Sequence, residues 1–150
     1  MIDVKELRIG NIIQYDGWHP DLASHNRPMP PYEVIVRAIE YDEEKKCYII
    51  ESFHERAFED SFDPIPLNHK LLLDIGFKWD DEYLYYQPEL QNIQYRLVEF
   101  PKGTWILSKG FINYNHELTS IKFLHQFQNT YFSLEHEDFI IDIKKIKLTP

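Results

Sequence analysis

The sequence predicts an α+β fold, in which a small, bent N-terminal sheet or SH3-like barrel is followed by an antiparallel meander with one short and one longer helix. Two patterns support this prediction: short apolar segments alternate with turn residues along most of the chain, and helical periodicity is confined to two segments. Hydrophobic residues make up 43% of the 150 residues and aromatic residues 15%. That composition is sufficient to fill the core of a small domain.

The first half of the chain is predicted to be rich in strands. The expected strands are residues 11–15, 32–41 and 47–53. The segments between them have turn-like compositions: the Asp16-Gly17 dipeptide, a proline-rich loop at 19–31 and a charged reversal at 42–46. This pattern predicts three or four short strands around a small core.

A pair of prolines, Pro64 and Pro66, marks the expected boundary between two parts of the chain. Proline stiffens the backbone and donates no hydrogen bond to a sheet ladder. We therefore expect a β-rich part at 1–63 and an α+β part at 64–150, which together form one compact unit. In the second part, Asn68 is placed to cap a short helix that ends before Gly76. The antiparallel strands expected after this helix are 77–79, 83–86, 94–100, 104–108 and 111–114.

The longer helix is predicted at residues 120–134, with Thr119 or Ser120 as its cap. On a helical wheel its apolar residues gather on one half, as in a helix that packs against a core. After this helix, residues 139–143 are expected to form a closing strand.

The helix contains the sequence Leu-His-Gln-Phe-Gln-Asn-Thr-Tyr-Phe-Ser-Leu at 124–134. This segment resembles the C-terminal motif, His-Gln-Leu-Gln-Asn-Leu-Tyr-Phe, of an uncharacterised protein family of bacteriophages and mobile elements of gut-type bacteria. Two other segments resemble the same family: Glu6-Leu7-Arg8-Ile9-Gly10-Asn11 near the start, and Pro64-Ile65-Pro66-Leu67 with Leu71-Leu72 and Gly76-Phe77 in the middle. The chain departs from the family at Phe127 and Thr130, which replace leucines, and at the acidic stretch 135–138, which replaces a Thr-Gly turn. The resemblance implies a biological setting and no biochemical activity.

Four polar residues of the helix are candidates for binding or for structural hydrogen bonds. Gln128 falls inside the apolar half of the wheel, which favours a buried side chain that holds backbone in place. His125 lies at the edge of that half and is expected to act in the same way or to contact a partner. Gln126 and Asn129 face outward, and for them binding and structural roles are equally open.

The sequence shows no arrangement typical of an enzyme, so we predict no catalytic residues, no metal site and no cofactor. The seven histidines have no known metal-binding spacing, and the five glycines are isolated rather than grouped in a phosphate loop. Cys47 is the only cysteine and is expected to be a buried, structural thiol. The chain has neither a leader pattern at its start nor a long apolar run, so a cytoplasmic protein without membrane contact is expected.

Acidic residues are concentrated in the N-terminal half. The whole chain has a formal charge of −9, of which residues 1–66 account for −7. This distribution disfavours direct binding to nucleic acid and suits a basic partner, including a protein with a basic nucleic-acid groove. The acidic residues proposed to make this contact are Glu43, Glu44, Glu59 and Asp60.

A second candidate contact patch is the aromatic run Tyr83-Leu84-Tyr85-Tyr86. Consecutive residues of a strand point to opposite faces of a sheet, so at least one of these tyrosines is expected to be exposed. The sequence thus predicts a non-catalytic accessory protein that inhibits a host protein. The alternatives are a nucleic-acid-binding module that uses exposed tyrosines and, less favoured, a metal-dependent hydrolase. A homodimer is compatible with the many aromatic residues.

Overall fold

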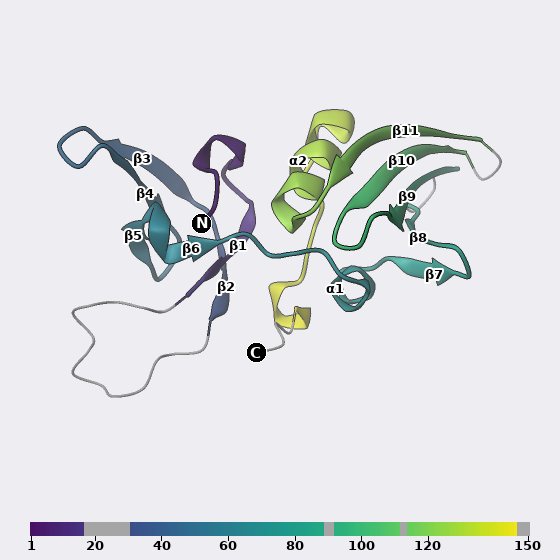
Figure 1. The fold of residues 1–150 in the computed structure, drawn as a ribbon, viewed down its shortest axis with the longest axis horizontal. Helices are drawn as coiled ribbons and strands as arrows, with labels where there is room; N and C mark the ends of the chain where they lie inside the picture. The colour runs from purple at the N-terminus through teal and green to yellow at the C-terminus, as the bar shows by residue number, and fades with distance from the viewer. Residues whose placement is uncertain (17–30, 89–91, 112–113, 147–150) are drawn as a thin grey trace. The chain divides into compact units, whose positions relative to one another are not determined.

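The computed structural model describes residues 1–16, 31–88, 92–111 and 114–146 and divides the chain into two compact units (Figure 1). The first unit contains Met1–Ile65 and Leu124–Ile140, and the second contains Pro66–Phe123 and residues 141–146. The loop predicted at 19–31 lies, apart from its last residue, outside the described residues. The boundary falls between Ile65 and Pro66, next to the predicted prolines. The longer helix belongs to the first unit, although the sequence suggested that it is part of the second.

Six strands form two three-stranded sheets in the first unit. The first sheet has the order β2-β1-β6, with bounds Tyr32–Ile35, Ile12–Tyr15 and Phe62–Asp63. The second has the order β3-β4-β5, with bounds Ala38–Asp42, Cys47–Glu51 and Arg56–Phe58. Two short 3-10 helices, η1 (Val4–Glu6) and η3 (Glu59–Ser61), complete this part. All strand pairs are antiparallel.

The prediction of a single strand at 32–41 is wrong, because the backbone changes its hydrogen-bonding partner strand in the middle of this segment. The Val36 N–H donates to the Asn11 carbonyl beside β1, whereas the Arg37 N–H donates to the Glu51 carbonyl on β4. The strand is thereby divided into β2 and β3, which belong to different sheets. Strands β5 and β6 are not evident from the sequence, since the acidic residues around them resemble a connecting loop.

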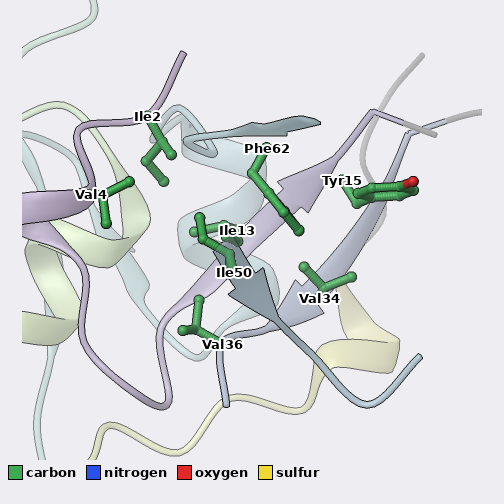
Figure 2. Close-up of a cluster of buried hydrophobic side chains, with 8 residues drawn as sticks. All are labelled: Ile2, Val4, Ile13, Tyr15, Val34, Val36, Ile50 and Phe62. Carbon is green, nitrogen blue, oxygen red and sulfur yellow. The ribbon is translucent and has the colours of Figure 1, made fainter. Parts of the chain in front are cut away.

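The core of the first unit is a cluster of eight buried side chains from both sheets and the N-terminal segment (Figure 2). Its members are Ile2, Val4, Ile13, Tyr15, Val34, Val36, Ile50 and Phe62. The Tyr15 ring lies 5.4 Å from the Phe62 ring and 5.5 Å from that of Tyr32. Ile13, Val36, Ile50 and Phe62 are fully buried, so this cluster joins the two sheets into one core.

The long helix, α2 (Leu124–Glu135), starts four residues later than predicted. Residues 119–121, expected to cap and begin the helix, instead end β11, and Ile121 pairs with Trp105. The pairing buries Ile121 beside a large ring, which outweighs the local helical pattern. The closing strand at 139–143 is also wrong. Phe139 packs against Phe127 and Tyr131 of α2, with ring centroids 4.9 and 5.0 Å apart, in a segment without regular structure.

The second unit contains an antiparallel meander in the order β11-β10-β9-β8-β7. Its strands are β7 (Lys78–Asp80), β8 (Tyr83–Tyr86), β9 (Ile93–Glu99), β10 (Trp105–Phe111) and β11 (Tyr114–Ile121). The prediction of a separate strand that begins at residue 111 is wrong, because β10 continues without interruption through Gly110 to Phe111. A 3-10 helix, η4 (Ile143–Lys145), also belongs to this unit.

The short helix, α1 (His69–Asp74), has the ends that the sequence predicts. Asn68 Oδ1 accepts a hydrogen bond from the Leu71 N–H at 2.9 Å, and Gly76 follows the helix with a φ of +110°. The His69 ring contacts Trp79 and Trp105, each 5.2 Å away between centroids. This contact places α1 on the face of the sheet that also contains Leu84, Leu97 and Leu107, all fully buried.

The α+β class of the prediction is confirmed: antiparallel sheets dominate, and two α-helices accompany them in the described part of the chain. The strands described in the first unit do not close into a barrel, so the SH3-like form is not confirmed. Among the described helices, none has the length and apolar character needed to span a bilayer.

Candidate functional site

Four predicted acidic contact residues lie at one end of the β3-β4-β5 sheet. Glu43 and Glu44 occupy the exposed turn between β3 and β4. Glu59 and Asp60 lie in η3, directly after β5. Since β4 begins at the turn and its pairing with β5 ends at Phe58, η3 lies beside the same end of β4. The fold therefore collects these residues from two segments that are 15 residues apart in sequence.

Cys47, the first residue of β4, lies within this acidic region. Desolvation, followed by the negative charges of Asp42, Glu59 and Asp60, raises the pKa of its thiol, and Lys45 acts in the opposite direction. A thiol with a raised pKa is a weak nucleophile at neutral pH. The side chain is half-buried, however, and not part of the core as the sequence suggested.

An apolar strip lies among these charges on the outer face of the sheet. Ile50 points into the core. Cys47 and Ile49 lie on the opposite face of β4, because successive side chains of a strand alternate between the two faces, and they therefore point outward. Ile49 pairs directly with Phe58 of β5, and both side chains are half-buried. The Lys45 ammonium lies 4.4 Å from the centre of the Phe58 ring. We call the strip and the surrounding acids the acidic face.

Charged residues also border the strip at its other end. Arg56 Nη2 contacts Glu40 Oε2 at 2.9 Å, and Arg56 Nε lies 3.7 Å from Glu51 Oε2. An apolar centre with a charged rim is typical of protein-protein contact surfaces. This strip was not predicted from the sequence. The available signal was the alternation of residues 47–51, which places Cys47 and Ile49 on the same side as Glu51.

The polar residues of α2 contact the N-terminal segment of the same unit. His125 Nε2 and Gln126 Nε2 lie 3.2 and 3.0 Å from Glu6 Oε2, and Asn129 Nδ2 donates to the Glu6 carbonyl at 2.6 Å. Asn129 Oδ1 also accepts from Asn11 Nδ2 at 2.9 Å. Gln126 and Asn129 are half-buried and hydrogen-bonded within the chain, which favours the structural alternative for them.

Gln128 is buried, in agreement with the helical wheel. Its exposed fraction is 4%. Its Oε1 accepts from the Ile12 N–H at 2.9 Å, and its Nε2 donates to the Gly10 carbonyl at 3.3 Å. The side chain thus connects α2 to the beginning of β1. Segments 6–11 and 124–134, which are far apart in sequence, are therefore in direct contact.

His125 is the most buried ionisable side chain of this contact, with an exposed fraction of 1%. Burial lowers the pKa of the imidazole below its usual 6.5, and the nearby Glu6 carboxylate opposes that change. The neutral ring is therefore favoured in the folded protein. This environment suits a structural histidine that holds η1 against α2.

The three candidate tyrosines lie on two faces of the meander. Tyr86 shares the α1 face with buried Leu84, and its ring is 5.8 Å from that of Phe77. Tyr83 and Tyr85 lie on the opposite face, half-exposed, with their ring centroids 6.2 Å apart. The prediction that the run divides between both faces is confirmed. The pKa of Tyr83 is raised by desolvation and by the hydrogen bond to Asp80.

No group of three histidine, cysteine, aspartate or glutamate side chains in the described ranges is arranged to hold a metal ion. The predicted contact residues lie on two surfaces: an acidic face in the first unit and a tyrosine-bearing face in the second. No protein-family model matches the chain, and comparisons with curated proteins and with solved structures likewise find no match.

Proposed function

We propose that this chain is a non-catalytic accessory protein that binds and inhibits a basic protein through the acidic face. The charge of the first unit carries this proposal. Its described residues contain 16 acidic and 6 basic side chains, a net charge of −10, whereas those of the second unit contain 7 and 8, a net charge of +1. The negative charge is therefore concentrated in the unit that presents the acidic face.

The arrangement of the acidic face supports a protein partner rather than a small ion. The carboxylates of Glu43, Glu44 and Asp60 would pair with arginine and lysine side chains and accelerate encounter with a positively charged surface. The half-buried Ile49 and Phe58 between them would lose water on contact, which supplies affinity that exposed ion pairs alone lack. A groove that normally holds nucleic acid has the matching positive charge.

The biological setting of the proposal comes from the resemblance to the phage and mobile-element family. A protein of such an element acts inside a bacterial host, so the proposed partner is a cytoplasmic host protein of a defence or nucleic-acid-handling complex. Occupation of its basic groove would exclude nucleic acid and thereby inhibit it. Residues 6–11 and 124–134, which carry the resemblance, contact each other inside the first unit. The resemblance therefore relates to the fold of the unit that presents the acidic face, and not to the acidic residues themselves.

The proposal is tested by affinity capture from nuclease-treated host lysate with three forms of the chain. The test variant is Glu43→Lys/Asp60→Lys, which changes the charge of the acidic face and spares Glu59, whose carboxylate accepts from the Tyr48 N–H. The matched control is Glu82→Lys/Glu137→Lys, which makes the same change in charge at exposed positions elsewhere.

A partner retained by the natural chain and the control, but lost from the test variant, would support the proposal. Purified partner should then lose nucleic-acid binding when the natural chain is added. Equal capture by all three forms, or capture of nucleic acid alone before nuclease treatment, would contradict it. Circular dichroism of each variant establishes that the fold is intact.

A further inference from the structure

The outer face of the meander, opposite α1, carries an aromatic and cationic surface that the acidic face does not explain. Antiparallel sheets usually present polar side chains on a solvated face. Here the outward positions contain Tyr83 and Tyr85, both half-exposed, and Val98, which is 41% exposed and pairs with Ile106. An apolar, aromatic surface on the solvated side of a sheet indicates a contact site.

Two cations flank Tyr85 across neighbouring strands. In the sheet register, Lys78 of β7 and Arg96 of β9 are both directly opposite Tyr85, so the three side chains form one row on this face. The Arg96 guanidinium also lies 4.5 Å from the centre of the Tyr83 ring. The row thus alternates positive charge, aromatic ring and positive charge.

Amide side chains hold Arg96 in position. Its Nε donates to Gln94 Oε1 at 3.3 Å. With the Asn115 amide turned so that its oxygen faces the guanidinium, the assignment that its surroundings favour, that oxygen also accepts from Nε at 2.9 Å. A guanidinium fixed in this way is oriented before a ligand arrives. Asp80 and Glu117 are the acids of the same face; Asp80 Oδ2 accepts from the Tyr83 hydroxyl at 3.1 Å, and Glu117 lies two strands beyond Arg96 in the row.

We propose that this face binds short single-stranded nucleic acid. A base would stack on the Tyr85 ring, and the adjoining phosphates would contact Lys78 and Arg96. Single-strand-binding surfaces combine stacking platforms with backbone-tracking cations in this manner. The charge of the unit agrees with this occupant, since a polyanion is repelled by the first unit, at −10, and not by the second, at +1. The inference concerns the second unit and does not depend on the proposed function.

The experiment measures the fluorescence anisotropy of a short, labelled oligothymidylate titrated with the full chain at several salt concentrations. Tyr85→Leu should weaken binding by between about five-fold and about a hundred-fold, which corresponds to the loss of one stacked base, and Tyr85→Phe should retain it. The logarithm of affinity falls with the logarithm of salt concentration, and Lys78→Gln should make this negative slope shallower by about 0.7. Tyr41→Leu removes an exposed tyrosine from the first unit and should change nothing.

Several results would overturn the inference. These are no anisotropy change at low salt, equal affinity of the natural chain and Tyr85→Leu, or equal affinity for a DNA duplex of the same sequence. A Tyr85-dependent partner that survives nuclease treatment would assign the face to a protein instead. Because Glu43→Lys/Asp60→Lys leaves this face untouched, failure of the acidic-face proposal and failure of this one are distinguishable.

Discussion

Replacement of Gln128 by leucine tests whether the contact between α2 and β1 supports the first unit. The substitution keeps a side chain of similar volume but removes both polar atoms. The Ile12 N–H, at a residue that is only 3% exposed, would lose its acceptor, and the Gly10 carbonyl would lose a donor. Because Ile12 is buried, water should replace the lost acceptor only if the helix moves.

The expected cost follows from these two hydrogen bonds. A buried donor without a partner costs about 1–3 kcal/mol, and the weaker bond to Gly10 contributes about 0.5–1.5 kcal/mol. Together they give a loss of roughly 2–4 kcal/mol in the free energy of unfolding of the first unit. Gln126→Leu is the matched control, because the bond of its side chain to the exposed Glu6 carboxylate should contribute only about 0.5 kcal/mol.

Urea unfolding followed by far-UV circular dichroism measures this difference. The helical signal comes mainly from α2, which has 12 residues against 6 in α1. The midpoint for Gln128→Leu should decrease by about 1–2 M relative to the natural chain, and that for Gln126→Leu should hardly change. Equal midpoints for the two variants would refute the structural role of Gln128. A fully stable Gln128→Leu chain that no longer binds its partner would instead identify the residue as functional.

Three further predictions concern His125, Asn68 and Cys47. Since burial lowers the pKa of His125 below 6.5, the unfolded chain binds a proton first as the pH falls. The contribution of His125 to the free energy of unfolding should be complete above pH 6.5 and decline below it. Urea titrations at several pH values should show a smaller decline for His125→Gln than for the natural chain, and an unchanged decline for the exposed His54→Gln. Asn68→Ala removes the N-cap of α1 and should cost about 1 kcal/mol, visible as faster amide hydrogen exchange in that helix. Alkylation of Cys47 by iodoacetamide should be slow at neutral pH. Asp42→Asn, which removes the neighbouring charge with the largest effect on the thiol pKa, should accelerate it; an unchanged rate would contradict this effect of the carboxylate.

Local signals were sufficient to predict the elements that depend on neighbouring residues. The ends of α1 follow from Asn68 and Gly76, because a cap and a left-handed glycine act within one turn of the helix. The return of the chain between β7 and β8 follows in the same way from residues 80–82. Gln128 was recognised as buried because the helical period places it among apolar residues.

Elements that depend on distant partners were predicted poorly. Val36 and Arg37 have no local feature that divides a strand, and only their separate bonds to Asn11 and Glu51 show where the chain changes sheet. Ile121 fits a helix by period, yet pairing with Trp105 keeps it in β11. In both cases a contact between residues far apart in sequence overrides local propensity.

For the candidate contact residues, too, local features could be predicted and spatial neighbours could not. The four acidic residues could be selected by charge alone, but their gathering beside one end of β4 depends on the pairing of β4 with β5. The role of Asn129 was undecidable from the wheel, since its partners, Glu6 and Asn11, are more than a hundred residues away. Likewise, no local pattern shows that Lys78 and Arg96 lie on either side of Tyr85.

The return of α2 to the first unit also changes where the charge lies. Counted along the sequence, the acidic residues 135–138 belong to the C-terminal part, and the half that ends at residue 66 has a charge of only −7. In the fold these acids join the first unit, where Asp138 Oδ1 accepts from Arg8 Nη2 at 2.6 Å, while Lys144 and Lys145 remain with the second. The described units therefore differ by eleven charges, which is more than any division of the sequence into halves suggests. A basic surface should be attracted to the first unit and a nucleic-acid strand should avoid it, so the two proposed ligands would bind different units without competing for one site.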